Sequence, residues 1–491
     1  MRTNYQPVIG LEIHAVMETQ SKMFCDCPVV DSTHAIPNDA VCPVCAGFPG
    51  MLPVLNQAAV EFALRVALAL NCEIQLNSVF ERKSYFYPDL PKGYQISQYQ
   101  QPLAVNGWLE FESAGKEQRV SIRRVHLEED TGKLTHRQDE ESRYSLVDLN
   151  RSGIPLLEIV TEPEMHSAET VRDFAYELRS VLRYLAVNSG NLEKGLLRIE
   201  PNISIRPEGS KELFTRVEVK NLNSFRSVER AVDFEIEHQE QQLLAGETIS
   251  QQTLGWDDVA AKTVPQRSKE VAEDYRYFPE PDLPPLMLQD EWIEEIRASL
   301  PELPSTKRKR FSTQYGLKDY DAGVLAAEIA VANFFEASIK QAQSKNAGEL
   351  ANWISGPLFA HLNDLNSSID EVGISPESFA SLMDLIANER INASGARQIL
   401  AAIIESKSDP EKLMAELKLE QNSSETEISK QILSTLMDNQ GQVDAYLAGK
   451  EELFNWFFGQ VMATFSGKAN PKIVRERLQA EFAKLKAGAN K

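Results

Sequence analysis

Carboxylates stand in parts of this sequence where a β-strand would be expected to carry apolar side chains. Glu158 lies inside the apolar stretch LLEIV, and Glu128 and Glu129 follow the strand pattern of residues 120–127. A carboxylate inside an apolar strand is unfavourable unless it is paired or bound to a metal. Because Arg124 and Arg151 are close in sequence, we infer a sheet-borne magnesium and nucleotide site. The alternative is an exposed acidic loop plus one edge-strand Glu that faces water.

Two later strand patterns repeat this feature. In residues 197–207 the odd-numbered isoleucines share one face, and Glu200 and Asn202 share the other. In residues 216–220 Glu218 and Lys220 likewise oppose two valines. A polar face turned to water explains most such patterns. Repeated faces of acid, base and amide favour a concave sheet that holds a charged ligand, and we select Arg124, Asn202 and Lys220 as phosphate-binding candidates.

The N-terminal strand pattern VIGLEIH places Glu12 and His14 on one face. Such a pair could supply two ligands to a metal. Taken alone, this motif favours a strand with one solvated face.

Four cysteines form two pairs, Cys25 with Cys27 and Cys42 with Cys45, separated by a Pro-containing loop. Two such pairs predict a tetrahedral zinc site that is closed and therefore structural. The alternative is four free or redox-active thiols. Cys72 follows a helical pattern and is expected to be a buried thiol.

Several enzyme classes are excluded by motifs that the sequence lacks. It contains no P-loop, no Gly-x-Gly-x-x-Gly after a strand and no Gly-x-Ser-x-Gly. If phosphate is handled here, metals and basic side chains on a sheet must handle it.

Composition is that of a globular protein of two to four domains. The chain has 491 residues, is 42% hydrophobic and carries a formal net charge of −21, which argues against a broad nucleic-acid surface. The N-terminus has no apolar signal core and no long uncharged apolar run occurs, so we expect a cytoplasmic protein without membrane contact.

Two breaks in composition divide the chain. Residues 1–290 mix strand patterns with helices, and residues 248–285, which end in a Pro-rich stretch, are interpreted as an ordered loop or a connector that leaves the first domain. Candidate helices follow at 319–338, 349–362, 375–388 and 394–404, and the polar run QNSSETE separates the last helices. The tail after Ser466 has a basic excess, which suits either a solvated helix or a patch for RNA.

The longer motifs resemble the B subunit of the tRNA-dependent amidotransferase. They are VIGLEIHAVMETQSKMFC, FPGMLPVLN, YFYPDLPKGYQISQYQQPL, HLEEDTGK, LVDLNRSGIPLLEIVTEPE, IEPNISIRP, EVKNLNSF, DYRYFPEPDLPPL and GKANP. The resemblance runs from Val8 to the C-terminus. It implies a subunit that uses ATP and Mg²⁺ to phosphorylate the carboxylate of misacylated Glu-tRNA(Gln), Asp-tRNA(Asn) or both. Ammonia from a glutaminase A subunit then replaces the phosphate, and a small C subunit joins A and B.

The resemblance also implies an α+β fold with three parts. Residues 1–290 would form an antiparallel-sheet cradle domain of the glutamine synthetase and guanido kinase type, with the zinc knuckle at 25–45. Residues 291–417 would form an all-α helical domain, and residues 418–491 a YqeY-like tail domain that binds tRNA.

Metal-binding positions of the family match Glu12, His14, Glu158, Glu218 and one of the pair Glu128 and Glu129, of which we prefer Glu129. Glu129, Glu158 and Lys220 are the expected catalytic residues. The zinc cysteines match a pattern that occurs in some members of the family.

Two alternatives remain for the function. The chain could be a non-catalytic tRNA-binding scaffold of such a complex, or a glutamine-synthetase-like enzyme that acts on a free amino acid. Hydrolysis of ATP that depends on Glu-tRNA would separate these alternatives from the amidotransferase hypothesis.

Overall fold

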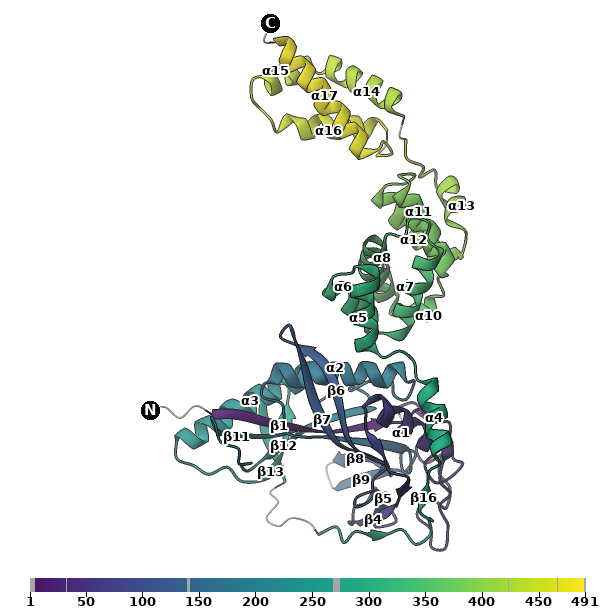
Figure 1. Ribbon diagram of the computed structural model, residues 1–491, viewed down its shortest axis with the longest axis vertical. Helices are drawn as coiled ribbons and strands as arrows, with labels where there is room; N and C mark the ends of the chain where they lie inside the picture. Colours follow the sequence, from purple (N-terminus) through teal and green to yellow (C-terminus); the bar gives the residue numbers. More distant parts are fainter. Residues whose placement is uncertain are drawn as a thin grey trace. The chain divides into compact units, whose positions relative to one another are not determined.

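The computed structural model describes residues 5–31, 33–138, 142–267, 274–422, 424–465 and 467–489. The chain divides into two compact units, Met1–Lys307 and Arg308–Lys491 (Figure 1). The first combines sheets with helices and the described part of the second is helical, which confirms the α+β class.

A nine-stranded sheet runs through the first unit. Its strands, in order across the sheet, are β14 (Lys262–Arg267), β13 (Gln252–Asp257), β12 (Val217–Lys220), β11 (Leu197–Pro207), β1 (Tyr5–Val16), β10 (Pro155–Thr161), β7 (Lys116–Glu129), β6 (Ala104–Ser113) and β2 (Glu73–Ile74). Neighbouring strands are antiparallel except β12 and β13, which are parallel. The strands predicted around Glu12, Glu128, Glu158, Glu200 and Glu218 are therefore confirmed.

Smaller sheets complete the β-structure of this unit. They are β15 (Phe278–Pro279) with β4 (Glu81–Ser84) and β5 (Tyr94–Ser97), β16 (Leu286–Met287) with β3 (Asn77–Ser78), and the hairpin of β8 (Lys133–Gln138) with β9 (Arg143–Asp148).

Helices α2 (Ala168–Tyr184) and α3 (Phe225–Leu244) lie together along the large sheet (Figure 1). Apolar side chains of α2, among them Val171, Phe174 and Leu178, are buried in the core with the apolar side chains of β1. Ser167 caps α2 by accepting a hydrogen bond from the Thr170 N–H at 3.1 Å. Because every second side chain of β1 packs into this core, the side chains between them point to the opposite face of the sheet, where polar groups can be placed.

The two remaining helices of the first unit are α1 (Gln57–Ala69) and α4 (Asp290–Ser299). Asn56 caps α1 by accepting a hydrogen bond from the Ala58 N–H at 2.9 Å. Ile293 and Ile296 of α4 belong to the same core, so this unit continues beyond residue 290.

The interpretation of residues 248–285 as a loop or an outgoing connector is wrong for much of its length. Its first half forms β13 and β14 of the large sheet, and Phe278–Pro279 pairs with β4. Four consecutive residues of β13, 253–256, are buried, so this strand lacks the alternation that marks a half-buried strand in a sequence. Residues 268–273 lie outside the described part.

The second unit contains two hydrophobic clusters. The first joins residues between Phe311 and Met414, and the second joins residues between Ile428 and Phe482. Helices of the first cluster are α5 (Pro304–Tyr315), α6 (Asp319–Ala326), α7 (Ile329–Gln341), α8 (Ala347–Trp353), the π-helix η1 (Ile354–Leu358), α9 (Phe359–Leu365), α10 (Ile369–Val372), α11 (Pro376–Ala387), α12 (Ala393–Ser406) and α13 (Pro410–Glu416). Helices of the second are α14 (Glu425–Asp438), α15 (Gln440–Leu447), α16 (Leu453–Thr464) and α17 (Pro471–Ala489).

The single helix predicted over residues 319–338 is two helices, because α6 and α7 meet at a bend of 115°. The helix predicted over 349–362 contains the π-turn η1, where Pro357 lacks the N–H that a regular helix needs. In the described residues no single helix has the length and apolar character to cross a membrane, although the bent pair α6 and α7 passes that test together.

Candidate active site

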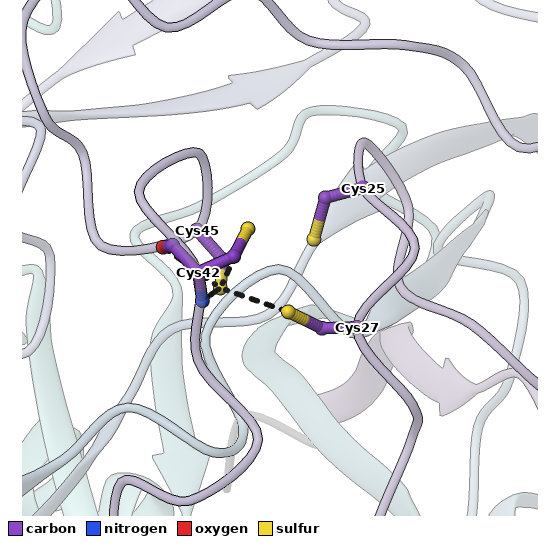
Figure 2. Close-up of side chains that lie close together, drawn as sticks. All are labelled: Cys25, Cys27, Cys42 and Cys45. Carbon is purple, nitrogen blue, oxygen red and sulfur yellow. Dashed lines mark hydrogen bonds between the residues drawn. The ribbon is translucent and has the colours of Figure 1, made fainter.

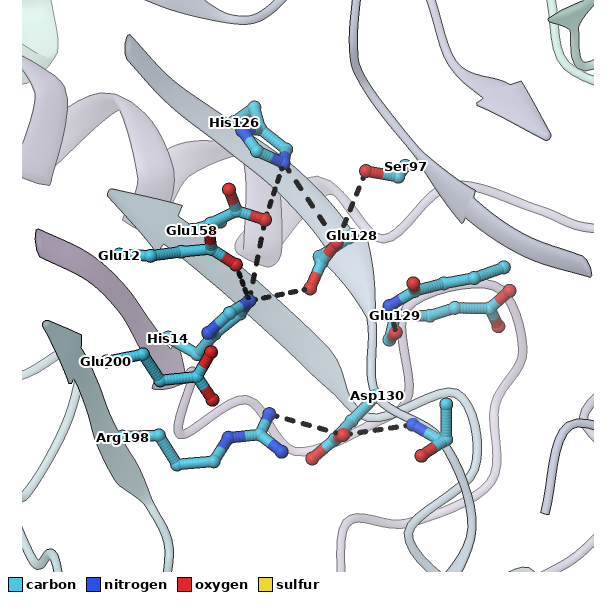
Figure 3. A network of polar contacts seen from close by, with 12 residues as sticks. Glu12, His14, Ser97, His126, Glu128, Glu129, Asp130, Glu158, Arg198 and Glu200 are labelled. Atoms are coloured by element: carbon cyan, nitrogen blue, oxygen red, sulfur yellow. Dashed lines mark hydrogen bonds and ion pairs between the residues drawn. The ribbon is translucent and has the colours of Figure 1, made fainter. Parts of the chain in front are cut away.

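His14 lies at the centre of a carboxylate cluster on the face of the large sheet opposite its main core. Strand register places Glu158 opposite His14 on one side and opposite His126 on the other. His14 Nε2 lies 3.4 Å from Glu158 Oε2, 3.5 Å from Glu128 Oε1 and 3.8 Å from Glu12 Oε1 (Figure 3). Only 6% of Glu158 is exposed, so the carboxylate that the sequence placed inside an apolar strand is buried beside His14.

β11 extends the cluster with alternating charges. Glu200 lies opposite Glu12, and Arg198 lies opposite His14. Arg198 Nη2 lies 3.3 Å from Asp130 Oδ1 (Figure 3). β11 therefore adds a possible metal ligand, Glu200, and a positive charge, Arg198, to the same face of the sheet.

A cavity of about 780 Å³ opens beside this cluster. Its lining includes Glu12, Lys83, Asn202, Glu218 and Lys220. This volume falls within the range of small-molecule and cofactor pockets. Lys220 Nζ lies 2.8 Å from Glu200 Oε2 and 3.4 Å from Glu218 Oε1, so a cation sits between two acids at the cavity wall.

The electrostatics of the cluster favour a protonated His14 when no metal is bound. Burial alone lowers the pKa of His14, but the hydrogen bond to Glu158 and the charges of Glu128 and Glu200 raise it to about 9. Burial raises the pKa of Glu158, but the charge of His126 and hydrogen bonds from both imidazoles hold it well below its usual range. A metal that binds His14 would therefore have to displace its proton.

The donor set fits divalent metal ions. One group comprises His14, Glu128 and Glu158, another comprises Glu12, His14 and Glu200, and in each the ligand atoms lie within 4.8 Å of one another. Carboxylate oxygens are the ligands that Mg²⁺ prefers. The buried Nδ1 atoms of His14 and His126 have no hydrogen-bond partner in the described structure.

The structure brings most of the predicted residues together. Glu12, His14 and Glu158 converge, and Arg124 Nη2 lies 3.6 Å from Glu158 Oε1. Asn202, Glu218 and Lys220 line the adjoining cavity. Glu218 also accepts a hydrogen bond from Thr253 Oγ1 at 2.8 Å and is in neither ligand group.

Glu129, which the sequence analysis preferred to Glu128, points away from this cluster. It accepts from the Ile96 N–H at 3.0 Å and pairs with Lys92, while Glu128 faces His14 (Figure 3). Adjacent residues of a strand point to opposite faces, so only one of the two can join His14.

Sequence reasoning did not select Glu200, His126 or Lys83. His126 precedes Glu128 by two residues, the spacing that also relates Glu12 to His14, and Glu200 lies on the predicted polar face. Burial alone lowers the pKa of Lys83, but the charge of Glu128 and further groups raises it above the usual range. Lys83 therefore brings a persistent ammonium to the cavity wall.

The four predicted zinc ligands form a second cluster in the loops after β1. The thiols of Cys25, Cys27, Cys42 and Cys45 gather within 4.8 Å of one another (Figure 2). Cys45 Sγ lies 3.9 Å from the sulfurs of both Cys27 and Cys42. Bonds of about 2.3 Å to a tetrahedral zinc separate sulfurs by about 3.8 Å, so the geometry fits that ion.

The four thiols differ in how readily they lose a proton. The hydrogen bond from Cys25, followed by the hydrogen bond from the Cys42 backbone and the charge of Lys22, lowers the pKa of Cys45 to about 4 against the effect of burial. Burial raises the pKa of Cys27 to about 11. Cys72 is a separate buried thiol whose pKa burial raises to about 12, as expected for an inert cysteine.

Comparison with known families covers both units. The family described as the GatB/GatE catalytic domain matches residues 7–294, and the family described as the GatB domain matches residues 333–482. The cluster, the cavity and the four cysteines all lie within the first match.

Curated relatives match over nearly the whole chain. A protein of Caldicellulosiruptor saccharolyticus is 46% identical over 484 residues, which cover 98% of this chain and 100% of that protein. A protein of Thermomicrobium roseum is 48% identical over 475 residues, covering 97% and 98%, and one of Thermotoga maritima is 45% identical over 477 residues, with the same coverage. Each is named as the B subunit of an aspartyl/glutamyl-tRNA(Asn/Gln) amidotransferase. The chain therefore belongs to the GatB family of amidotransferase B subunits.

Proposed function

We propose that this chain is the B subunit of an enzyme that converts Glu-tRNA(Gln) to Gln-tRNA(Gln), Asp-tRNA(Asn) to Asn-tRNA(Asn), or both. Support comes from the relatives' name and from the convergence of carboxylates on a cavity walled by cations. A carboxylate on the tRNA becomes a good acceptor for ammonia once its oxygen carries a phosphoryl group. The γ-phosphoryl group of ATP would pass to that oxygen and leave ADP. Ammonia would then form the amide bond and release phosphate.

The side chains of the cluster have two roles in this proposal. Glu128, Glu158, Glu12 and Glu200, with His14, would hold Mg²⁺, which when bound neutralises charge on phosphate oxygens. Lys83, Lys220 and Arg124 would orient the phosphates and stabilise charge that develops during transfer. This chemistry requires positioning and charge, and no nucleophilic side chain.

The proposal also covers the domains of the chain, the other subunits of the enzyme and a structural zinc ion. We assign the first unit, Met1–Lys307, to a cradle of the glutamine synthetase and guanido kinase class, followed by a helical domain and a YqeY-like tail domain. A glutaminase A subunit and a small C subunit would complete the enzyme in the cytoplasm, and the four cysteines would hold structural zinc.

Glu158→Gln tests the catalytic assignment in the assembled complex. The substitution keeps the size of the side chain and deletes its charge, so ATP-dependent amidation should fall by about 10²–10³ or more while glutaminase activity and tRNA binding persist. Glu162→Gln is the matched control, because Glu162 lies just beyond the same strand and pairs with the exposed Arg123. Unchanged activity of Glu158→Gln at low magnesium would contradict the assignment.

The second candidate function is a scaffold that binds tRNA without catalysing the reaction. It is supported by the excess of basic residues after Ser466, which could bind the phosphates of tRNA. Some of those cations have partners within the tail, since Arg477 pairs with Glu425, and Arg475 lies 5.0 Å from the Phe458 ring centre. Truncating the chain after Gln421 removes α14 to α17 together with the hydrophobic cluster that they form. The truncated protein should have a higher KM for tRNA and keep the glutaminase activity that does not depend on tRNA. Hydrolysis of ATP dependent on Glu-tRNA and lost in Glu158→Gln excludes the scaffold hypothesis.

A further inference from the structure

Lys22 is a completely buried lysine whose charge the proposed reaction does not use. It lies between β1 and Cys25, with 0% of its surface exposed. Its Nζ donates to Ala40 O at 2.8 Å, to Leu149 O at 3.2 Å and to Cys45 Sγ at 3.5 Å. A buried cation is strongly unfavourable unless opposite charge lies close by.

These contacts use every proton of an ammonium group. Lysine carries three N–H donors and no acceptor, and two carbonyl oxygens and one sulfur receive them. Within the described residues, none of these three side-chain bonds ends on a carboxylate. Of these three acceptors, the Cys45 sulfur is the one that can carry a full negative charge.

We propose that Lys22 is the permanent counter-charge of a metal bound by the four cysteines, and that it retains the metal by offsetting the negative charge of the thiolates. A zinc ion with four thiolates has a net charge of −2, and burying that charge is unfavourable without a compensating cation. The N–H of Cys42, which donates to Cys45 Sγ at 3.2 Å, assists with a dipole but supplies no charge. Groups that hydrogen-bond to metal ligands commonly change metal affinity by about 10–100-fold.

The same ammonium links the cysteine loops to the sheet face that carries the carboxylates. Its bond to Leu149 O anchors the 148–153 loop, whose Ser152 Oγ also donates to Cys45 O at 3.0 Å. Gly153 N donates to Asp130 O at 2.9 Å, and Asp130 holds Arg198 beside His14. Lys22 is therefore a positioning residue, connected to the cavity through this loop.

Three substitutions separate charge from hydrogen bonding. Lys22→Gln keeps donors without the charge, Lys22→Met removes both, and Lys22→Arg keeps the charge. Lys194→Met is the control, because Lys194 is half-exposed and pairs with Asp31. The readouts are zinc per chain in the assembled complex and the rate of zinc transfer to a coloured chelator.

Lys22→Gln and Lys22→Met should release zinc about 10–100-fold faster than the unmodified protein. Lys22→Arg should stay within about threefold of it, as should Lys194→Met. The proposal is overturned if Lys22→Gln holds zinc as firmly as the unmodified protein, if Lys22→Arg releases it as fast as Lys22→Gln, or if the unmodified protein binds no metal. Because neither readout involves tRNA or ATP, failure of the amidation proposal leaves this test unaffected.

Discussion

The carboxylate cluster and the cysteine cluster each bring together side chains that repel one another when they are ionised. The carboxylates lie on β-strands, and the cysteines lie in loops. Glu12, Glu158 and Glu200 sit on strands whose register fixes their backbone positions. The cysteines sit on loops with little regular hydrogen bonding of their own. The two clusters also differ in the number of basic side chains near them. Arg124, Arg198 and Lys220 lie beside the carboxylates. In the described residues, Lys22 is the one basic side chain that contacts a cysteine sulfur.

This difference indicates that the cysteine loops need a bound metal to keep their fold, whereas the carboxylate strands do not. Strand pairing and built-in cations hold the carboxylates together, so a metal there is free to come and go with a substrate. The loops around the cysteines need cross-links, and the thiols supply them only when a metal binds. Substitution in the first cluster should therefore affect activity, and substitution in the second should affect folding.

The largest effect is expected from the neighbouring residues Glu128 and Glu129. Glu128→Gln should lower tRNA-dependent ATP hydrolysis by about 10²–10³ and leave the Tm nearly unchanged, because Glu128 faces His14. Glu129→Gln should mainly lower the Tm, because it removes the charged partner of Lys92, whose side chain is 12% exposed, at a cost of up to about 3 kcal/mol. Rates and melting curves of both variants check this contrast, and a reversed pattern would restore Glu129 as the catalytic residue.

The phase of β7 shows how far sequence can decide between these two residues. Period-two alternation predicted the polar faces of β1 and β11 correctly, because their apolar residues mark the core side. On β7, Val125 and Leu127 are buried in the core, which places Glu128 on the opposite face. Glu129 has the parity of the core residues, but it ends the strand and turns to Ile96 instead.

Other features lay beyond local patterns. Apolar residues continue through positions 319–338, so periodicity gives no sign of the bend between α6 and α7. Lys22 looks like an ordinary surface lysine in sequence, and its burial depends on contacts with Ala40 and Leu149, which only the fold brings close. Pairing of Glu158 with two histidines likewise depends on which strands are neighbours.

A smaller effect, on stability, is expected when the cysteine cluster is broken. Cys42→Ser should remove zinc and lower the Tm of the first unit by several degrees, about 2–4 °C for each kcal/mol lost. Cys72→Ser is the control, because Cys72 lies in the core away from the other four thiols. Metal analysis and calorimetry check the result. A zinc-free protein with four freely titrating thiols and an unchanged Tm would exclude a structural metal.

A pH effect is expected at the carboxylate cluster. Because the pKa of His14 is raised to about 9, its proton must leave before Nε2 can bind a metal. Metal affinity should rise by up to roughly tenfold for each pH unit between 7 and 9 and then level off. The metal-free protein should show the opposite trend in stability, since a raised histidine pKa contributes most below about 6.5 and is lost as pH passes 9.

Titration with Mn²⁺ at several pH values measures this dependence without substrates. His14→Gln should bind the ion more weakly and with a flat pH profile. A wild-type affinity that does not change between pH 7 and 9 would contradict the assignment of His14 as a ligand.

The smallest effect is expected from Glu235 of α3, a carboxylate with 1% of its surface exposed. Burial raises its pKa, although hydrogen bonds from Gln239 Nε2 at 3.0 Å and Thr263 Oγ1 at 3.2 Å oppose the shift. Since the folded state favours the protonated form, this contribution to stability is present at low pH and is lost as pH rises through the folded pKa. Glu235→Gln should therefore raise the Tm by about 1–3 °C at pH 8 and leave it nearly unchanged at pH 4. Melting curves at both pH values measure the difference, and an equal shift at each would show that charge at Glu235 has no part in it.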